Sequence, residues 1–439
     1  MFKSNRNPQF RSKFSEDIFY TKYSHEGAET FHELACTLVE DVCQDKLSKD
    51  DKEALIDHIS NLRFIPGGRY LYYAGREKKF FNNCYLLKAE EDTREDWADL
   101  SWKSESCLMT GGGIGIDYSV YRPEGQTLKG TGGISSGPIP KMQMINSIGQ
   151  KVMQGGSRRS AIYASLNWQH DDVDKFLKAK NWFDMPVGNT GKTLFDIKQD
   201  DFNFPAPLDM TNISVNYDTE WLLNYWEKGE IGDVFRTNVR QALRTAEPGF
   251  SFNFFEKENE TLRNACTEVT SEDDSDVCNL GSLNFARIDD LNQLQEVVQL
   301  ATQFLLCGTL RASLPYEKVY QVRASNRRLG LGLMGLHEWL IQRGHRYETT
   351  SELHRWFKVY EAESDKVARS FANQLNISVP VAVRAVAPTG TIGILAGTST
   401  GVEPIFAVAY KRRYLKNKRW HYQYVVDSAA QEMIELYGV

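Results

Sequence analysis

Three residues of different chemistry alternate within five positions of this chain. Asn264, Cys266 and Glu268 are an amide, a thiol and a carboxylate. In extended backbone alternate side chains point to the same side, so these three could converge on one small substrate. A second thiol, Cys278, follows after an acidic, loop-like stretch. The pattern suits chemistry in which one sulfur attacks and another is oxidised. The alternative is a surface turn that happens to contain two cysteines.

The composition is that of an ordinary soluble globular protein. The chain has 439 residues, of which 41% are hydrophobic and 25% charged. Its length permits two or three domains, or one large α/β barrel. The formal net charge of -6 offers no global basic field, so no nucleic-acid partner is predicted. Any polyanionic ligand must be met by local basic residues or by backbone amides.

Cysteine usage and apolar runs indicate the compartment. The seven cysteines are an odd number without a Cys-x-x-Cys pair, so neither a structural zinc site nor any other metal is predicted in this chain. No apolar run is long enough to span a bilayer, and the N-terminus lacks an apolar signal core. These features predict no membrane partner and a reducing cytoplasm, that of the host if the protein is viral. A pair of thiols there is catalytic more often than structural.

Periodicity divides the chain into two regions. Helical spacing of apolar residues over 29–44 and 52–62, after a polar arm, predicts a small N-terminal helical cap spanning residues 1–65. Beyond it, strands, glycine-rich loops and helices follow one another without an internal repeat. This rhythm predicts one α/β domain over residues 66–439, with its site at the strand ends. Strands are expected at 70–73, 80–87, 111–117, 212–216 and 378–387, and helices at 97–109, 138–153, 220–226, 231–245, 291–310, 334–342, 351–373 and 427–437.

Several glycine-rich turns could meet a ligand. The glycines at 111–113 enter a strand, which suits close approach of a ligand or of another backbone. Residues 154–161 combine glycines with two arginines, as phosphate binding requires, although a solvated basic turn fits as well. The turn at 389–391 offers hydroxyl and N–H groups to an anion. Residues 188–193 look like a P-loop, but Pro186 stands where that motif needs its first glycine.

Taken together and in this order, the motifs resemble the catalytic large subunit of ribonucleotide reductases. The resemblance runs from about residue 64 to 414. It rests on five segments: 81–84 (FNNC), 264–268 (NACTE), 277–282 (VCNLGS), 154–159 (QGGSRR) and 388–391 (PTGT). It implies the ten-stranded α/β barrel of ribonucleotide reductases and glycyl radical enzymes, with a central finger loop carrying Cys266. The implied reaction reduces ribonucleoside di- or triphosphates to 2′-deoxyribonucleotides.

The resemblance also implies a role for each catalytic residue. Cys266 would carry a transient thiyl radical that takes the ribose 3′-hydrogen, inside a barrel that keeps out quenchers. Glu268 would act as general base toward the 3′-hydroxyl, and Asn264 would hold the ribose hydroxyls. Cys84 and Cys278 would supply the electrons for loss of the 2′-hydroxyl and end as a disulfide. An external dithiol of the thioredoxin or glutaredoxin type would then reduce that disulfide.

Two nucleotide sites are implied as well. The substrate site would use Gly67, Gly68, Asn83, Gly113, Thr389, Gly390, Thr391 and Ile392. The effector site, for a deoxynucleoside triphosphate such as dTTP or dATP, would use Asp92, Arg122, Lys129 and Arg158. Effector binding in this family occurs at a two-fold subunit contact, so a homodimer is expected.

The chain departs from typical members at both ends. Its N-terminal region is too short for the ATP-binding cone, so this is a compact form with a specificity site only. Typical members continue through two further barrel strands, which are expected to be missing here. The alternatives are a small member, a split or truncated gene product, and a fragment.

The radical source would be external, either adenosylcobalamin or a ferritin-like, metal-containing small subunit. Two other classes remain as alternatives: a non-catalytic nucleotide-binding or regulatory protein, and a P-loop-like ATPase. The three cysteines 84, 266 and 278, together with Glu268, argue against the first class, and Pro186 weakens the second.

Overall fold

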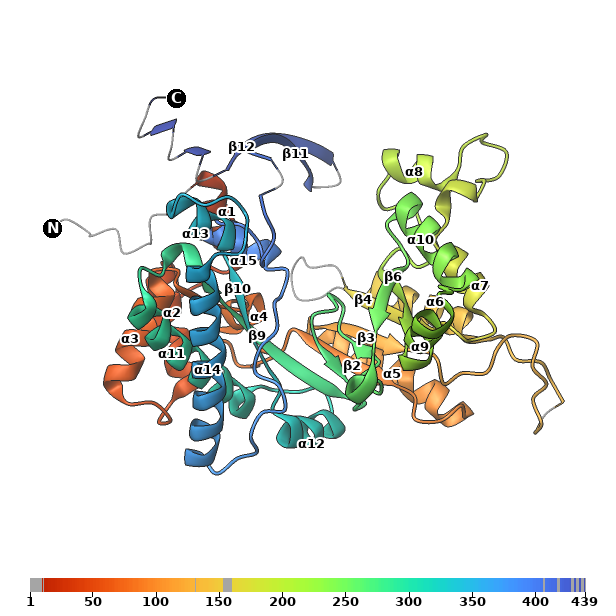
Figure 1. Cartoon of the computed structure of the whole chain (residues 1–439), viewed down its shortest axis with the longest axis horizontal. Helices are drawn as coiled ribbons and strands as arrows, with labels where there is room; N and C mark the ends of the chain where they lie inside the picture. Colours follow the sequence, from red (N-terminus) through yellow and green to blue (C-terminus); the bar gives the residue numbers. More distant parts are fainter. Residues whose placement is uncertain are drawn as a thin grey trace. The chain divides into compact units, whose positions relative to one another are not determined.

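A computed structural model describes most of the chain (Figure 1). The described residues are 10, 12–130, 132–152, 160–405, 407–416, 419–427, 430–431, 434–435 and 438. They fall into two compact units, each built from segments distant in the sequence. The first unit comprises Met1–Asn82, Cys278–Ser313 and Ala324–Val439, and the second comprises Asn83–Val277 and Leu314–Arg323. Among the described residues, no helix is both long and apolar enough to cross a membrane.

The second unit is built on a sheet of five parallel strands in the order β2-β3-β4-β5-β6. The strands are β2 Cys84–Lys88, β3 Gly113–Asp117, β4 Ile162–Asn167, β5 Thr211–Tyr217 and β6 Gly249–Phe252. The helices are α5 Arg94–Met109, α6 Pro138–Lys151, α7 Val173–Lys178, η1 Trp182–Asp184, α8 Leu194–Asp200, α9 Thr219–Lys228, α10 Asp233–Thr245 and η2 Phe255–Lys257. Two short strands follow, β7 Leu262–Arg263 and β8 Thr270–Ser271. Strands alternate with crossover helices, as parallel pairing requires.

The first unit surrounds the long strand β9 (Asp276–Asn284), whose first two residues belong to the second unit. Strand β1 (Phe64–Pro66) pairs with β9 antiparallel, and β10 (Leu329–Met334) pairs with it parallel. Its helices are α1 Lys13–Lys22, α2 Phe31–Cys43, α3 Lys49–Ser60, α4 Gly68–Tyr73, η3 Phe285–Arg287, α11 Leu291–Arg311, α13 Leu336–Gln342, α14 Ser351–Gln374 and α15 Gly390–Ala396. Helix α12 (Glu317–Asn326) begins in the second unit, and strands β11 (Ala409–Lys416) and β12 (Arg419–Val426) form a separate hairpin. Helix α11 carries the core, because most of its residues are buried.

Most predicted helices are confirmed, including both helices of the N-terminal cap. Helix α2 begins at a capping box, in which Thr30 accepts from the Glu33 amide and the Glu33 carboxylate accepts from Thr30. Ser48 caps the start of helix α3, because its side chain accepts from the amide of Asp51. Polar caps of this kind set where each helix starts.

The strand predicted over residues 70–73 is wrong, because this segment is helix α4. The amide of Tyr70 donates to the carbonyl of Gly67 at 2.8 Å, which starts the helical turn. The Tyr70 ring stacks on Phe81 at 4.7 Å and meets Phe304 at 5.0 Å. Packing of the aromatic ring therefore outweighs the strand propensity of tyrosine.

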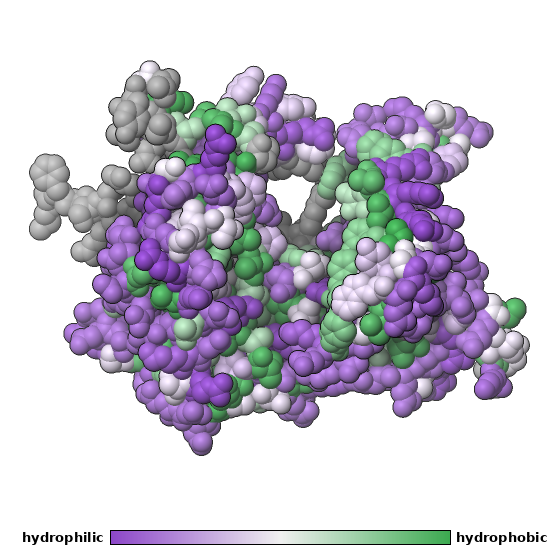
Figure 2. Space-filling view, in the orientation of Figure 1, coloured by the Kyte–Doolittle hydropathy of each residue, from purple (hydrophilic) through white to green (hydrophobic). Residues whose placement is uncertain are grey.

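Other differences concern strands. Residues 378–387 form one isolated bridge, between Leu331 and Arg384, and no regular strand. Strand β10 and the β11–β12 hairpin were not predicted. The surface view adds one feature of the second unit: exposed apolar side chains gather at its end strand β6 and helix α10 (Figure 2), among them Phe250, Phe252 and Leu243.

Candidate active site

The segment between β7 and β8 is a tight loop, which we call the finger loop (residues 262–271). The two strands pair antiparallel, with Arg263 opposite Thr270. At the tip Thr267 has a φ of 69°, and its amide donates to the carbonyl of Asn264 at 3.0 Å. The extended backbone expected here is therefore wrong, because a left-handed residue turns the chain between Cys266 and Glu268. As a result Asn264 is buried while Cys266 is exposed.

Asn264 connects the finger loop to the first predicted redox cysteine. Its Oδ1 accepts from the amide of Val269 at 3.0 Å, which closes the loop. Its Nδ2 donates to the Sγ of Cys84 at 3.0 Å, and both residues are buried. The amide side chain therefore has a structural partner on each side. The structure places Cys84, Asn264 and the tip carrying Cys266 and Glu268 in one part of the second unit.

The glycines of β3 let the finger loop lie directly on the sheet. A Cβ built on Gly115 would stand 1.6 Å from the carbonyl oxygen of Arg263, and one on Gly113 would stand 2.9 Å from the Cβ of Ala265. Of the two alternatives raised by the glycine run, the structure thus shows close approach of another backbone. Gly115 was missed as a site residue; its signal was the recurrence of glycine two positions after Gly113, on the same face of a strand.

Arg263 ties the base of the finger loop to the end of β6. Its guanidinium donates to the Oγ of Ser251 at 2.5 Å, to the carbonyl of Phe252 at 3.1 Å and to the Oδ1 of Asn253 at 3.1 Å. A planar guanidinium with three acceptors in fixed directions holds the loop in one orientation. Sequence reasoning missed Ser251 and Asn253, because neither belongs to a motif.

Glu268 has the environment of a proton acceptor. Both carboxylate oxygens are buried and have no hydrogen-bond partner among the described residues. Burial raises the pKa of this carboxyl, and the side chain of Asn264 opposes part of the rise. A carboxyl whose pKa lies above its ordinary value binds a proton near neutral pH more readily, which general base catalysis requires.

We expect Glu268→Gln to stabilise the fold while removing this acceptor. With its raised folded pKa, the wild-type residue contributes most stability below the ordinary carboxyl pKa of about 4.3, and this contribution is lost as pH rises through the folded value. Urea unfolding at about pH 7 should show the variant more stable by about 1 kcal/mol, because the neutral amide avoids the desolvation of a charged carboxylate. The gain should shrink as pH falls. The exposed neighbour Glu258→Gln is the control, and an equal gain in that variant would contradict the assignment.

The predicted second redox cysteine lies in the first unit. Cys278 is buried in β9, and its Sγ lies 3.5 Å from the carbonyl of Asn279. A Cβ on Gly330 would stand 3.1 Å from this sulfur, so the neighbouring strand β10 needs glycine there. The predicted substrate residue Gly67 lies in the same unit, where its amide donates to the carbonyl of Leu280 at 2.8 Å. Gly68 follows as the first residue of α4.

The predicted phosphate turn begins α15, in the first unit. Thr389 has a φ of 49°, and its hydroxyl accepts from the amide of Gly401 at 2.8 Å. This hydroxyl therefore helps to hold a turn of the protein, and its O–H remains a donor for the predicted anion. The amides of Gly390, Thr391 and Ile392 are the first of a helix, where N–H groups lack an acceptor within the helix.

Two of the four predicted effector residues form an ion pair. The Arg122 guanidinium contacts the Asp92 carboxylate, and its Nη2 donates to the Asp92 carbonyl at 3.0 Å. The Arg122 amide also donates to this carboxylate, at 3.1 Å. Lys129 is exposed in the loop that follows. Arg158 lies outside the described residues, as does most of the loop over 154–161.

The remaining cysteines lie in packed surroundings. Cys43, Cys107 and Cys307 are buried, as expected for thiols that serve packing, and Cys36 is half-buried beside His32 at 3.6 Å. Burial raises the pKa of Cys107. Within the described part of the chain, no group of three or more His, Cys, Asp or Glu side chains could hold a metal ion.

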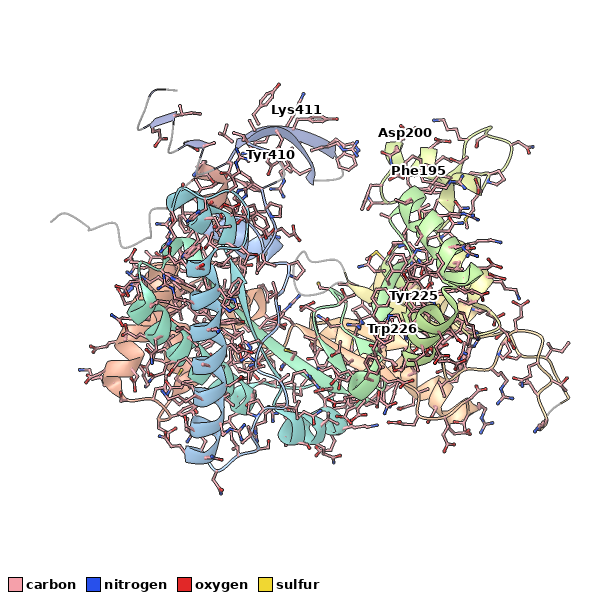
Figure 3. All side chains as sticks on the ribbon, viewed as in Figure 1. Phe195, Asp200, Tyr225, Trp226, Tyr410 and Lys411 are labelled. Carbon is pink, nitrogen blue, oxygen red and sulfur yellow. The ribbon has the colours of Figure 1, made fainter. Side chains whose placement is uncertain are left out.

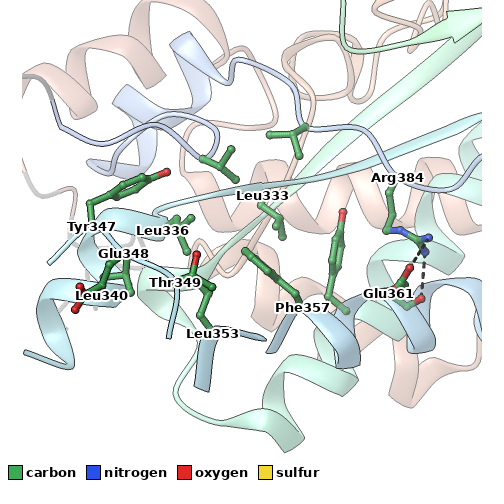
Figure 4. Close-up of a pocket in the computed structure, with 13 residues that line it drawn as sticks. Leu333, Leu336, Leu340, Tyr347, Glu348, Thr349, Leu353, Phe357, Glu361 and Arg384 are labelled. Carbon is green, nitrogen blue, oxygen red and sulfur yellow. Dashed lines mark hydrogen bonds and ion pairs between the residues drawn. The ribbon is translucent and has the colours of Figure 1, made fainter. Parts of the chain in front are cut away.

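A pocket of about 610 Å³ lies in the first unit, between β10, α13 and α14 (Figure 4). Its wall is mostly apolar, with Leu333, Leu336 and Phe357 among the lining residues. At one end Arg384 donates to the carbonyl of Glu361 at 3.1 Å. None of the residues predicted for the active site lines this pocket.

Comparison with known proteins adds three findings. The family model described as "Ribonucleotide reductase, barrel domain" matches residues 82–185, 216–362 and 381–437. The vitamin B12-dependent ribonucleoside-diphosphate reductase of Thermoplasma acidophilum is 28% identical over 398 residues, covering 82% of this chain and 50% of that protein. A putative adenosylcobalamin-dependent ribonucleoside-triphosphate reductase of Mycobacterium phage D29 is 29% identical over 380 residues, covering 74% of this chain and 52% of that protein.

The fold also matches a solved structure, the class Id ribonucleotide reductase alpha subunit of Actinobacillus ureae. The TM-score is 0.73 at 15% identity, over 91% of this chain and 76% of that one. The predicted α/β barrel fold is thereby confirmed. The chain spans about half the length of the curated relatives it matches.

Proposed function

Because the chain belongs to the barrel-domain family of ribonucleotide reductases, we propose that it is a catalytic subunit that reduces ribonucleoside di- or triphosphates to 2′-deoxyribonucleotides. One observation carries this proposal. Cys84, Asn264 and the finger-loop tip gather in the second unit, with two buried carboxylate oxygens at Glu268 and an exposed Cys266. A thiol and a proton acceptor on one loop suit hydrogen abstraction next to a hydroxyl that must lose its proton.

In the proposed reaction Cys266 Sγ, as a thiyl radical, takes the hydrogen from C3′ of the ribose. Glu268 accepts the proton of the 3′-hydroxyl, and the 2′-hydroxyl leaves as water after protonation. The Cys84 and Cys278 thiols supply two electrons and two protons, one proton to the departing water and one hydrogen to C2′, and they become a disulfide. Glu268 returns its proton to the 3′-oxygen. Cys266 then returns its hydrogen to C3′. A dithiol protein of the thioredoxin or glutaredoxin type reduces the disulfide for the next turnover.

The radical must come from outside this chain. Adenosylcobalamin, or a metal-containing small subunit, would supply the unpaired electron that activates Cys266. The exposure of Cys266 fits an external generator. The names of the Thermoplasma and phage relatives favour adenosylcobalamin.

The effector site and a homodimer are part of the proposal. Arg122 and Asp92 already form an ion pair. A bound nucleotide would take over some of the hydrogen bonds that these two residues now make to each other. Helices α5 and α6, which pack on each other in the second unit, expose Trp102, Met109 and Met144. Large apolar side chains on adjacent helices are typical of a surface that a second copy covers.

A thiol count tests the proposed reaction. In a single turnover without external reductant, the chain with adenosylcobalamin should lose two thiols for each deoxynucleotide formed. Mass spectrometry of the quenched protein should find those thiols as a Cys84–Cys278 disulfide. The half-buried Cys36→Ser variant should show the same ratio. If only a candidate small subunit supports product, that subunit is the generator; product without thiol loss would refute the proposed electron source.

A further inference from the structure

The hairpin of β11 and β12 belongs to a basic segment of the sequence, which also carries aromatic residues at alternate positions. Residues 409–426 contain six Lys or Arg and no Asp or Glu, in a chain whose net charge is -6. The strands pair antiparallel, with Lys411 opposite Tyr424 and Arg413 opposite Tyr422. Residues directly opposite one another in a hairpin share one face of the ribbon, so these four side chains share a face.

The two faces of the hairpin have different surroundings. On one face the Arg412 guanidinium lies over the Phe14 ring at 4.7 Å, so this face contacts helix α1. On the other face Lys411 is exposed, and Tyr422 and Tyr424 are 58% and 79% exposed. Figure 3 shows the neighbouring residues Tyr410 and Lys411 leaving the ribbon on opposite sides.

Cations and rings interleave on this exposed face. The Lys411 Nζ lies 4.8 Å from the centre of the Tyr422 ring and 5.8 Å from that of Tyr424. The Arg413 guanidinium lies over the Trp420 ring at 4.1 Å. Among the described residues, no carboxylate forms an ion pair with Lys411 or Arg413. The rings hold the two cations in place while leaving their charge uncompensated.

We propose that this face, formed by Lys411, Arg413, Trp420, Tyr422 and Tyr424, binds single-stranded nucleic acid. Unpaired cations attract a phosphate backbone, and exposed rings two residues apart on one strand offer stacking surfaces to unpaired bases. Duplex bases are already stacked and cannot use these rings. An acidic peptide would use the cations and leave the tyrosines without a partner. The net negative charge of the chain predicts no nucleic-acid binding. A local cluster of basic residues can nevertheless bind a polyanion, and this hairpin supplies such a cluster.

Fluorescence anisotropy with a labelled oligothymidylate of about 20 nucleotides tests the proposal on the full chain. Binding should weaken steeply with salt. Lys411→Gln with Arg413→Gln should lower the slope of log affinity against log salt by about 1.4, since each neutralised phosphate of a single strand contributes about 0.7. Arg355→Gln with Lys358→Gln is the matched control, because this exposed pair on α14 carries the same two charge types. An unchanged slope in the hairpin variant, or an equal change in the control, would overturn the proposal.

The aromatic variants separate stacking from charge. Tyr422→Ala and Tyr424→Ala should each weaken oligothymidylate binding roughly tenfold, whereas Tyr422→Phe and Tyr424→Phe should retain it because a ring remains. Circular dichroism should show all four variants folded. Duplex DNA and polyglutamate should compete poorly, and an excess of dTTP should not compete. Strong competition by polyglutamate would assign the face to an acidic peptide, and competition by dTTP would place the oligonucleotide in a nucleotide site; either result overturns the proposal.

Discussion

Replacing Cys266 with serine should abolish deoxynucleotide formation, with a loss of at least about 10³-fold in turnover. A serine O–H bond is much stronger than a thiol S–H bond, so the radical generator cannot move the unpaired electron onto the loop tip. The substitution is nearly isosteric, and the side chain is exposed. The free energy of unfolding should therefore stay within about 0.5 kcal/mol of the wild-type value. The measurement is product formation under the conditions that support the wild-type chain.

Two further readouts distinguish a chemical role of Cys266 from a structural one. Effector binding, followed by calorimetry with dTTP, should be unchanged, because Asp92 and Arg122 lie on other segments of the second unit. Cys36→Ser is the matched control and should keep full turnover. Substantial product from Cys266→Ser would remove this residue from the mechanism, whatever the sequence similarity of its neighbours.

Adding one methyl group at Gly115 should displace the finger loop. The new Cβ would stand 1.6 Å from the Arg263 carbonyl oxygen, where backbone and not a flexible side chain is the obstacle. We expect Gly115→Ala to lower the free energy of unfolding by about 3 kcal/mol, at the upper end of overpacking effects. Turnover should fall with it, because Cys266 and Glu268 move with the loop. Urea unfolding and product formation measure the two effects.

Gly130→Ala is the control for this substitution. A Cβ on Gly130 meets no heavy atom within 4 Å, and its backbone lies outside the left-handed region, so stability should change little. Equal losses of stability in both variants would mean that any glycine-to-alanine substitution has this effect, whatever surrounds the glycine. A stable Gly115→Ala protein with normal turnover would show that the loop does not need its close contact with β3.

Residue types and motif order predicted the family and the barrel fold, but not the shape of the finger loop. The structure brings Asn264 into contact with Cys84 and pairs Asp92 with Arg122, although each pair is distant in the sequence. Both contacts are made between segments that the folded chain brings together. The alternate spacing of Asn264, Cys266 and Glu268 predicted that their side chains share one face. This prediction was wrong, because the left-handed backbone of Thr267 turns the chain at the tip of the finger loop.

Secondary structure failed where packing or local composition outweighed periodicity. Residues 68–73 have strand-like composition, yet Tyr70 packs with two phenylalanine rings in a helix. The β11–β12 hairpin has no apolar alternation to reveal it, since each of its faces carries both cations and aromatic rings. Strand β10 contains alternating glycines at 330 and 332, which lower strand propensity but admit neighbouring segments.

By itself, then, the sequence determined which chemical groups this protein has and in what order: the thiols, the carboxylate, the amide and the glycine turns that match a reductase barrel. Only the tertiary structure decided their environments. The carboxylate oxygens of Glu268 are buried, while Cys266, two residues away, is exposed. The glycine at 115 receives the backbone of the finger loop. The physical reason is that burial and close contact are made by segments distant along the chain, which local spacing does not encode.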